Sequence, residues 1–216
     1  MKWPHYFTMG ISGCNNNSIQ GNTFIGERHY NSLHCLASKD NIISNNSFSF
    51  TPGDSDEEFS IAVWYGSERN RICNNSIAHG LSVDNSHHNT IQNNNFQENE
   101  KDLGISISLG SSTQNVLFGN TIQSCYLSSC DNNSIYYNNI KAFANVFDDG
   151  HNTWNLSYPS GGNHWNNHPG SDHYSGVAQN ETGADGIGDI LYTIPGGDNQ
   201  DQYPLVLPFG MTQLAF

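Results

Sequence analysis

An eight-residue phrase recurs along this chain and constrains its fold more than any other feature. It reads N-x-φ-x-x-N-x-φ, where φ is an apolar residue. A repeat of about twenty residues with variable spacing is typical of a solenoid, in which each repeat forms one coil and insertions form loops. The copies begin at Asn17, Asn41, Asn70, Asn89, Asn115 and Asn133, and a degenerate seventh copy begins at Asn152.

The residues of the phrase favour short strands over helix. Apolar residues such as Ile19 and Phe24 are separated by an Asn and flanked by Asn, Ser and Gly, which are poor helix formers. We expect two strands that meet at an Asn corner, because Asn tolerates the left-handed conformation of a sharp bend. A third apolar strand precedes each copy, most clearly where Ile105, Ile107 and Leu109 alternate. Three strands per coil predict an all-β fold, a parallel β-helix of about seven coils.

One position of the phrase predicts the core. The first apolar residue of each copy should point inward and stack on its equivalent in the next coil, while the corner Asn side chains form amide ladders as in cross-β structures. The register between the apolar residues and the Asn argues against low-complexity disorder. The predicted core stack consists of Ile19, Ile43, Ile72, Ile91, Leu117 and Ile135.

Composition bounds the partners and the compartment. The formal net charge is −13, with seven Lys and Arg. A chain so poor in basic residues is not expected to bind nucleic acid or an anionic membrane surface. It contains neither an apolar run that could enter a membrane nor a recognisable signal peptide. We expect a protein of the extracellular space or cell surface, in a mature form or as a fragment of a longer chain.

Five cysteines leave at least one unpaired in any disulfide scheme. Cys125 and Cys130 are the only plausible internal pair, because the Cα atoms of a disulfide must lie within roughly 4.4–6.8 Å. Buried inert thiols are the preferred interpretation, and an intermolecular bridge is the second. The cysteines are Cys14, Cys35, Cys73, Cys125 and Cys130.

From Asp148 the chain changes character and becomes rich in Gly, Trp, Tyr and His. Its elements include D-D-G-x-N-x-W at Asp148, G-G-N-x-W at Gly161, D-G-I-G-D at Asp185 and G-G-x-N-x-D-x-Y-P-L at Gly196. These resemble the ends of archaeal surface proteins, many from methanogens, that are right-handed parallel β-helix repeat proteins of the NosD-type or CASH-domain family. Where those proteins commonly read G-N-Y-W-S-D-Y, this chain has His164 and His168.

The resemblance implies a right-handed coil region over residues 1–155 and an irregular C-terminal cap over residues 156–216. NosD itself is linked to copper delivery for nitrous oxide reductase, which makes a copper-binding accessory role one alternative. Physically, a cap would cover the open sheet edge at the end of the last coil. The aromatic residues available to close that end are Trp154, Trp165, Tyr174, Tyr192 and Tyr203.

The acidic residues of the cap are the candidate metal ligands. Calcium takes six to eight oxygen ligands from loops of this kind, and Asp185 and Asp189 lie around two glycines. The alternative is that these carboxylates cap turns by accepting backbone N–H groups. The predicted calcium ligands are Asp172, Asp185, Asp189, Asp198 and Asp201.

Other patterns support catalysis or copper binding more weakly. Asp148, Asp149 and His151 resemble the acid pair and histidine of polygalacturonases, but the other motifs of those enzymes are missing. A lyase would need the acidic loop at residues 54–58 to act with Arg69 or Arg71. Imidazoles suit copper, yet no Met-rich or Cys/His cluster accompanies them. The histidines considered are His87, His88, His164, His168 and His173.

We therefore expect a non-catalytic structural protein of an archaeal envelope, sheath or adhesive layer. The first coil strand begins near Gly10 with almost no residues before it to cover its edge. Such an edge presents unpaired N–H and C=O groups, so we expect self-association there. The main alternative is a carbohydrate-active β-helix: a polysaccharide lyase, an epimerase or a module that binds a cell-surface glycan.

Overall fold

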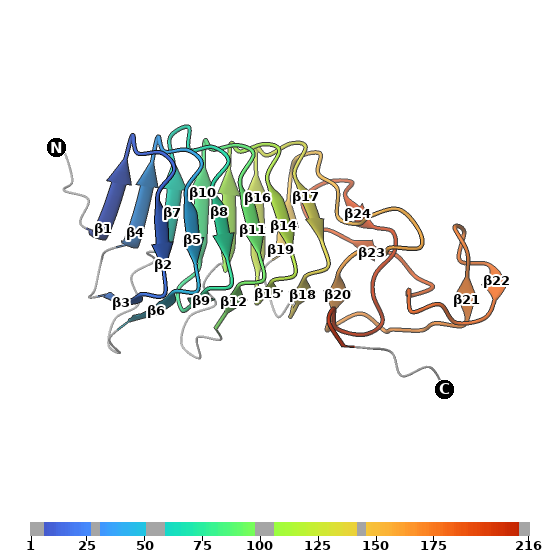
Figure 1. The fold of residues 1–216 in the computed structure, drawn as a ribbon. Helices are drawn as coiled ribbons and strands as arrows, with labels where there is room; N and C mark the ends of the chain where they lie inside the picture. Colours follow the sequence, from blue (N-terminus) through green and yellow to red (C-terminus); the bar gives the residue numbers. More distant parts are fainter. Residues whose placement is uncertain (1–6, 27–30, 51–58, 98–105, 142–145, 212–216) are drawn as a thin grey trace.

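The structure is a computed structural model that describes residues 7–26, 31–50, 59–97, 106–141 and 146–211. Three parallel sheets run along a rod from the N-terminal to the C-terminal end (Figure 1). Consecutive strands belong to different sheets, and each strand pairs with its equivalent one coil further on. The chain is therefore an all-β, right-handed parallel β-helix, which confirms the predicted fold class.

The strands of the first sheet precede each phrase. The strands of the second sheet come from the first half of each phrase, and those of the third sheet come from the second half. The first sheet contains β1 (Phe7–Ser12), β4 (Asn31–Leu36), β7 (Ile61–Trp64), β10 (Leu81–Asp84), β13 (Ile107–Gly110), β16 (Cys125–Ser128) and β19 (Val146–Asp148). The second contains β2 (Ser18–Gln20), β5 (Ile42–Ser44), β8 (Arg71–Cys73), β11 (Thr90–Gln92), β14 (Val116–Phe118) and β17 (Ser134–Tyr136). The third contains β3 (Thr23–Gly26), β6 (Ser47–Phe50), β9 (Ser76–Ile77), β12 (Asn95–Phe96), β15 (Thr121–Ile122), β18 (Asn139–Ile140) and β20 (His164–Trp165).

Two short antiparallel hairpins follow the last coil. They pair β21 (Tyr174–Ser175) with β22 (Glu181–Thr182), and β23 (Tyr192–Thr193) with β24 (Gln200–Asp201). The β23–β24 hairpin lies next to the end of the rod, whereas β21 and β22 project beyond it (Figure 1). The described part of the chain has no helix long and apolar enough to cross a membrane.

The first apolar residue of each phrase lies at one position of the second sheet. Register pairs run from Ile19 to Ile43 and onward, coil by coil, to Ile135. Ile91 and its neighbours in the stack are fully buried, and Ile19 in the first coil is 5% exposed. A parallel stack of the third sheet begins with Phe24 and Phe48, whose rings lie 4.7 Å apart. The core is thus a set of apolar columns that run the length of the rod.

Two ladders of asparagines run along the corners, as the sequence predicted. In each rung the backbone N–H and the side-chain amide donate to the Oδ1 atom of the asparagine in the next coil. Asn94, for example, donates from N and Nδ2 to Asn120 Oδ1 at 2.9 and 3.0 Å, and from Nδ2 to the carbonyl of Ile72. The first ladder contains Asn17, Asn41, Asn70, Asn89, Asn115, Asn133 and Asn152. The second contains Asn22, Asn46, Asn75, Asn94, Asn120, Asn138 and Asn163.

The left-handed corner residue is not the ladder asparagine itself, which differs from our expectation. It is the residue immediately before, as in Asp40 (φ 59°) and Asn93 (φ 54°). Bending the chain and forming the ladder are carried out by adjacent residues, because the side chain of the ladder asparagine must point along the rod. The preceding residue makes the bend that turns the chain into the next strand.

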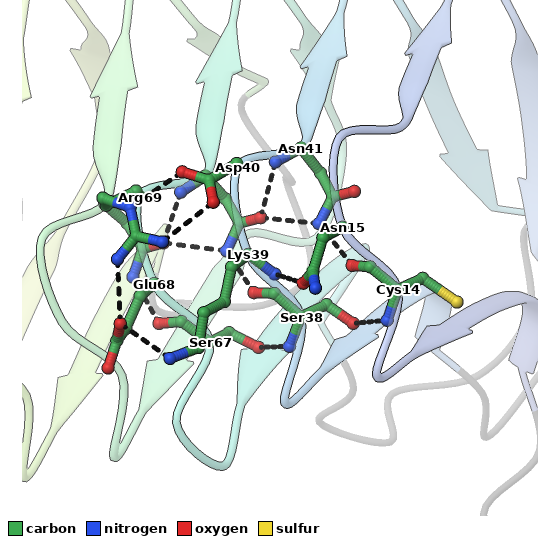
Figure 2. Close-up of polar contacts among 11 residues, drawn as sticks. Cys14, Asn15, Ser38, Lys39, Asp40, Asn41, Ser67, Glu68 and Arg69 are labelled. Carbon is green, nitrogen blue, oxygen red and sulfur yellow. Dashed lines mark hydrogen bonds and ion pairs between the residues drawn. The ribbon is translucent and has the colours of Figure 1, made fainter.

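A third ladder follows the corner after the first sheet. The hydroxyl of Ser38 accepts the N–H of Cys14, and Ser67 Oγ accepts the N–H of Ser38 (Figure 2). The same bond recurs at Ser86 and Ser112 and ends at the Cys130 thiol, which accepts the N–H of Ser112 at 3.4 Å. The two equivalent cysteine positions are therefore the two ends of one serine ladder.

The expected boundary between residues 155 and 156 falls inside the seventh coil. Thr153 forms an isolated parallel bridge with Ser134 of β17, at the end of the second sheet, so Trp154 lies at the position that follows Ile135. Trp165 in β20 pairs with Ile140 in β18. The G-G-N-x-W element at Gly161 is therefore the second half of the seventh phrase, separated from the first half by a longer loop.

Candidate functional site

The C-terminal end of the rod is closed by two tryptophans and two buried acids. Trp154 and Trp165 have 0% and 2% of their surface exposed. The indole N–H of Trp154 donates to Asp148 Oδ2 at 2.7 Å, and that of Trp165 donates to Asp201 Oδ2 at 2.9 Å. Tyr192 from the β23–β24 hairpin stacks on Trp165 with ring centroids 3.8 Å apart. Each large apolar ring is thus covered, and each indole donor has an acceptor.

Both asparagine ladders end on side chains of the C-terminal segment. Asn199 Oδ1 accepts the N–H of Asn152 at 3.2 Å, and Asp201 Oδ2 accepts the N–H of Asn163 at 2.7 Å. The amide of Leu205 donates to the carbonyl of Asn163 at 2.8 Å. We call residues 192–205 the plug, since they supply at this end the bonds that another coil would supply.

Burial changes the proton affinity of the two acids. Burial raises the pKa of Asp201 to about 6, although the N–H groups that donate to its carboxylate act to lower it. The pKa of Asp148 is also raised by burial, while Trp154 and Asn152 oppose the rise. Closing the end of the rod therefore requires two carboxylates to be held away from water.

The N-terminal end differs because the described residues place no strand beyond it. β1, β2 and β3 each pair with one neighbour, on the side of the second coil (Figure 1). Ile42 and Ser47 donate backwards to the carbonyls of Asn17 and Asn22, both at 2.9 Å. By the same register, the N–H groups at the equivalent positions of the first coil, Ser18 and Thr23, point toward the open edge.

Side chains at this N-terminal edge are more exposed than their equivalents further along the rod. Met9 is 38% exposed and Ile25 is 64% exposed. The thiol of Cys14 is exposed and free. An edge with unpaired main-chain groups and apolar side chains is a template for pairing with another chain.

The corner between the first and second sheets carries a network of charged side chains (Figure 2). Arg69 donates from Nε and Nη2 to the two carboxylate oxygens of Asp40, both at 2.8 Å. Glu68 Oε2 accepts from Lys39 at 2.9 Å and from Arg69 at 3.0 Å. The hydrogen bond from Arg69 lowers the pKa of Asp40, and that from Lys39 lowers the pKa of Glu68.

This network bears on the lyase interpretation. The Arg69 guanidinium is held by two carboxylates, and those contacts raise its pKa further. A guanidinium in that state cannot abstract a proton. The acidic residues 54–58 lie outside the described residues. Arg71 begins β8, on the outward face of the second sheet.

The polygalacturonase interpretation requires solvent-facing acids at Asp148 and Asp149. Asp148 is instead fully buried and accepts from Trp154, Asn152 and Gly150. Asp149 Oδ1 accepts the N–H of Ser129 at 2.6 Å. His151 lies beside Asp131, with Nδ1 and Oδ1 3.3 Å apart. These side chains serve the turn that leads into the seventh coil.

The five predicted calcium ligands do not form one group. Asp172 accepts the N–H groups of Asp185 and Gly186 at 3.0 and 2.9 Å. Asp189 accepts the N–H groups of His173 and Tyr174.

Asp201 is buried in the plug, whereas Asp198 is exposed on the same hairpin. The described residues contain no group of three or more His, Cys, Asp or Glu side chains arranged to hold a metal. Calcium binding stays a prediction. It is checked by comparing the melting temperature of the chain in excess calcium with that in chelator, and binding should raise it.

The histidines do not supply a complete copper site either. His164 and His168 lie near each other, and burial and His168 together lower the pKa of His164. His168 Nδ1 accepts the N–H of Gly170, and its Nε2 atom is buried without a hydrogen-bond partner. His173 is exposed, and His87 bonds Thr113. The donor set in the described part of the chain therefore does not fit a copper centre.

All five cysteines are free, so the structure contains no Cys125–Cys130 bridge. Cys35, Cys73, Cys125 and Cys130 are buried. Burial raises the pKa of the Cys35 and Cys130 thiols to about 11, and also raises that of Cys125. The thiols of Cys35, Cys125 and Cys130 therefore lack the thiolate character that metal binding or redox chemistry requires.

Sequence reasoning missed the roles of Asn199 and Asp201. Their spacing does not match the repeated phrase, and their position among other acids instead predicts a cap and a metal site. The signal that could have found them is chemical: each ladder needs one final acceptor, and these are an amide and a carboxylate beside the closing aromatic residues.

Comparison with known proteins agrees with the observed architecture. Residues 5–170 match the family model described as periplasmic copper-binding protein (NosD). No curated protein and no solved structure matches the chain at a significant level. Because the match covers most of the coils and more than half of the sequence, the chain belongs to the NosD family.

Proposed function

We propose that this chain is a non-catalytic structural protein of an archaeal cell envelope, sheath or adhesive layer. In this proposal it associates through the N-terminal edge of its β-helix. Family membership supports export, since the family is described as periplasmic. The archaeal source rests on the resemblance of the C-terminal motifs.

The observation that carries the proposal is the difference between the two ends of the rod. The C-terminal end is covered by Trp154, Trp165 and the plug. The strands β1, β2 and β3 have a neighbour on one side only within the described residues. A chain that pairs there gains main-chain hydrogen bonds and covers the apolar columns that begin at Ile19 and Phe24.

Each of the two alternative functions depends on a particular set of side chains. The carbohydrate-active alternative needs acidic and basic side chains that are free on one face. Lys39 and Arg69 are engaged in ion pairs. The copper alternative comes from the family description, and the described residues offer it no complete donor set.

The test is sedimentation of the purified chain over a concentration series, with and without reductant, together with electron microscopy of native envelope extracts. We expect concentration-dependent assemblies. The variant Ser18→Pro/Thr23→Pro removes the two N–H groups at the edge and should give monomers. Its matched control, Ser18→Ala/Thr23→Ala, keeps those N–H groups and should assemble normally.

A strictly monomeric particle at every concentration, in extracts as well as in purified form, would remove support for a structural polymer. It would place the carbohydrate-active alternative first. Assembly that is equally strong in the proline variant would show that another surface is responsible.

A further inference from the structure

The plug copies the chemistry of a coil without copying its sequence. In the first coil the N–H of Asn22 donates to Asn46 Oδ1, and its carbonyl accepts the N–H of Ser47, both at 2.9 Å. In the seventh coil the N–H of Asn163 donates to Asp201 Oδ2 at 2.7 Å, and its carbonyl accepts the N–H of Leu205 at 2.8 Å. The same two backbone groups are thus satisfied in the same way at both ends of the rod.

The apolar column of the third sheet is continued in the same manner. Phe24 stacks on Phe48 with ring centroids 4.7 Å apart and planes inclined by 4°. At the other end of this column Tyr192 stacks on Trp165 at 3.8 Å and 8°. The plug therefore supplies an aromatic ring where a further coil would have one.

The N-terminal edge offers the same groups in the arrangement that the seventh coil needs. Asn17 and Asn22 begin the two ladders, and in the described residues no earlier rung donates to their Oδ1 atoms. The ladders are directional, since every bond from one ladder asparagine to the next is donated toward the C-terminal end. The donors of Asn152 and Asn163 thus match the acceptors of Asn17 and Asn22, and Phe24 could cover Trp165.

We infer that the plug holds the place of the first coil of a second copy of this chain. Its release would expose the seventh coil to the N-terminal edge of another molecule. This inference rests on the proposed function, because it uses the same N-terminal edge, and it names the partner surface and the element that limits growth. The contact joins two different surfaces, so repeated association gives a head-to-tail filament.

The test compares two ways of releasing the plug. Asn199→Ala/Asp201→Ala removes the acceptors at the ends of both ladders. Gly196→Ala leaves those acceptors in place, but Gly196 has φ 113° and an added Cβ would lie 2.8 Å from the carbonyl oxygen of Asp148. Each variant is examined by circular dichroism, sedimentation and electron microscopy, alone and combined with Ser18→Pro/Thr23→Pro.

We expect the released chains to lose the monomer peak and to form filaments that lengthen with concentration. Combining either variant with Ser18→Pro/Thr23→Pro, which we call the edge prolines, should restore the monomer. If Asn199→Ala/Asp201→Ala loses its β-sheet signal in circular dichroism, the sedimentation and electron microscopy of Gly196→Ala test the inference instead. A folded released variant that stays monomeric overturns the inference, and so do assemblies that persist with the edge prolines.

Failure of this inference is distinguishable from failure of the proposed function. If the wild-type chain assembles and the edge prolines abolish that assembly, the proposed function stands whatever the released variants do. If the wild-type chain assembles through another surface while released variants form proline-sensitive filaments, the plug inference stands alone.

Discussion

Asp201 Oδ2 accepts the backbone N–H of Asn163 at 2.7 Å, in the place where every earlier rung of that ladder has an asparagine. The change from amide to carboxylate fits the position. An interior rung must accept from one coil and donate to the next, whereas the last rung needs only to accept. The same carboxylate also accepts the indole N–H of Trp165, so one buried side chain ends a ladder and fixes the closing aromatic residue.

Replacing Asp201 with Ala should lower the free energy of unfolding by about 3 kcal/mol, because two buried N–H donors lose their acceptor. Asp201→Asn keeps an acceptor oxygen and should cost clearly less. Urea unfolding followed by tryptophan fluorescence measures both. Equal losses for the two variants would show that the acceptor is not what Asp201 contributes.

The raised pKa of Asp201 predicts an unusual pH dependence. The pKa of this carboxyl rises from its ordinary 3.8 to about 6 in the folded chain, because the side chain is buried. Between these values the folded state holds a proton that the unfolded state has lost, so stability falls as pH rises through this window and is level above it. A shift of this size corresponds to about 3 kcal/mol.

The measurement is the difference in unfolding free energy between the wild type and Asp201→Asn from about pH 4 to about pH 7, a range that spans both pKa values. The partly exposed acids Asp40 and Glu68 have lowered pKa values, act in the opposite direction at lower pH, and are common to both proteins. Parallel curves for the two proteins across this range would contradict the assignment.

An interior rung of the ladder should matter more than its exposed neighbour. Asn94 is 1% exposed, accepts from Asn75 and donates to Asn120 and to the carbonyl of Ile72. Asn94→Ala should cost about 3 kcal/mol, because it leaves several buried groups unpaired. Asn95 is the next residue and is exposed at the start of β12, so Asn95→Ala should stay within about 0.5 kcal/mol of the wild type. Thermal and urea unfolding of both variants checks this, and equal losses would contradict it.

The core stack makes the strongest prediction for folding. Ile91 is fully buried between Ile72 and Leu117. Ile91→Asp should prevent folding, since an unpaired charge in a dry core is very costly. Asn95→Asp introduces the same charge at an exposed position and should leave the circular dichroism spectrum unchanged. A native spectrum and melting temperature for Ile91→Asp would show that the register is wrong.

The coils could be predicted because their physics is local and repeated. One position of the phrase, occupied by Ile91 or Leu117, always faces inward, and one asparagine always faces the next coil. The repeat therefore records side-chain direction as well as strand position. The strand that precedes each phrase was found for the same reason, from the alternation at Ile107 and Leu109.

The end of the rod could not be predicted in this way. The position of Asp201 among other acids in the sequence predicts a calcium site, but in the structure its carboxylate accepts from Asn163 and Trp165. A final acceptor can come from any distance along the chain, so no spacing rule identifies it. The seventh phrase was also obscured, because its two halves at Trp154 and Trp165 are divided by an inserted loop.

Amide hydrogen exchange at Ser18 and Thr23, measured at several protein concentrations, tests the proposed assembly most directly. The equivalent amides of the second coil, Ile42 and Ser47, donate to the first coil and should be protected at every concentration. If the N-terminal edge is the assembly surface, the amides of Ser18 and Thr23 should exchange fast in dilute solution and become protected as concentration rises. Fast exchange of both amides at concentrations where the chain is assembled would contradict the account.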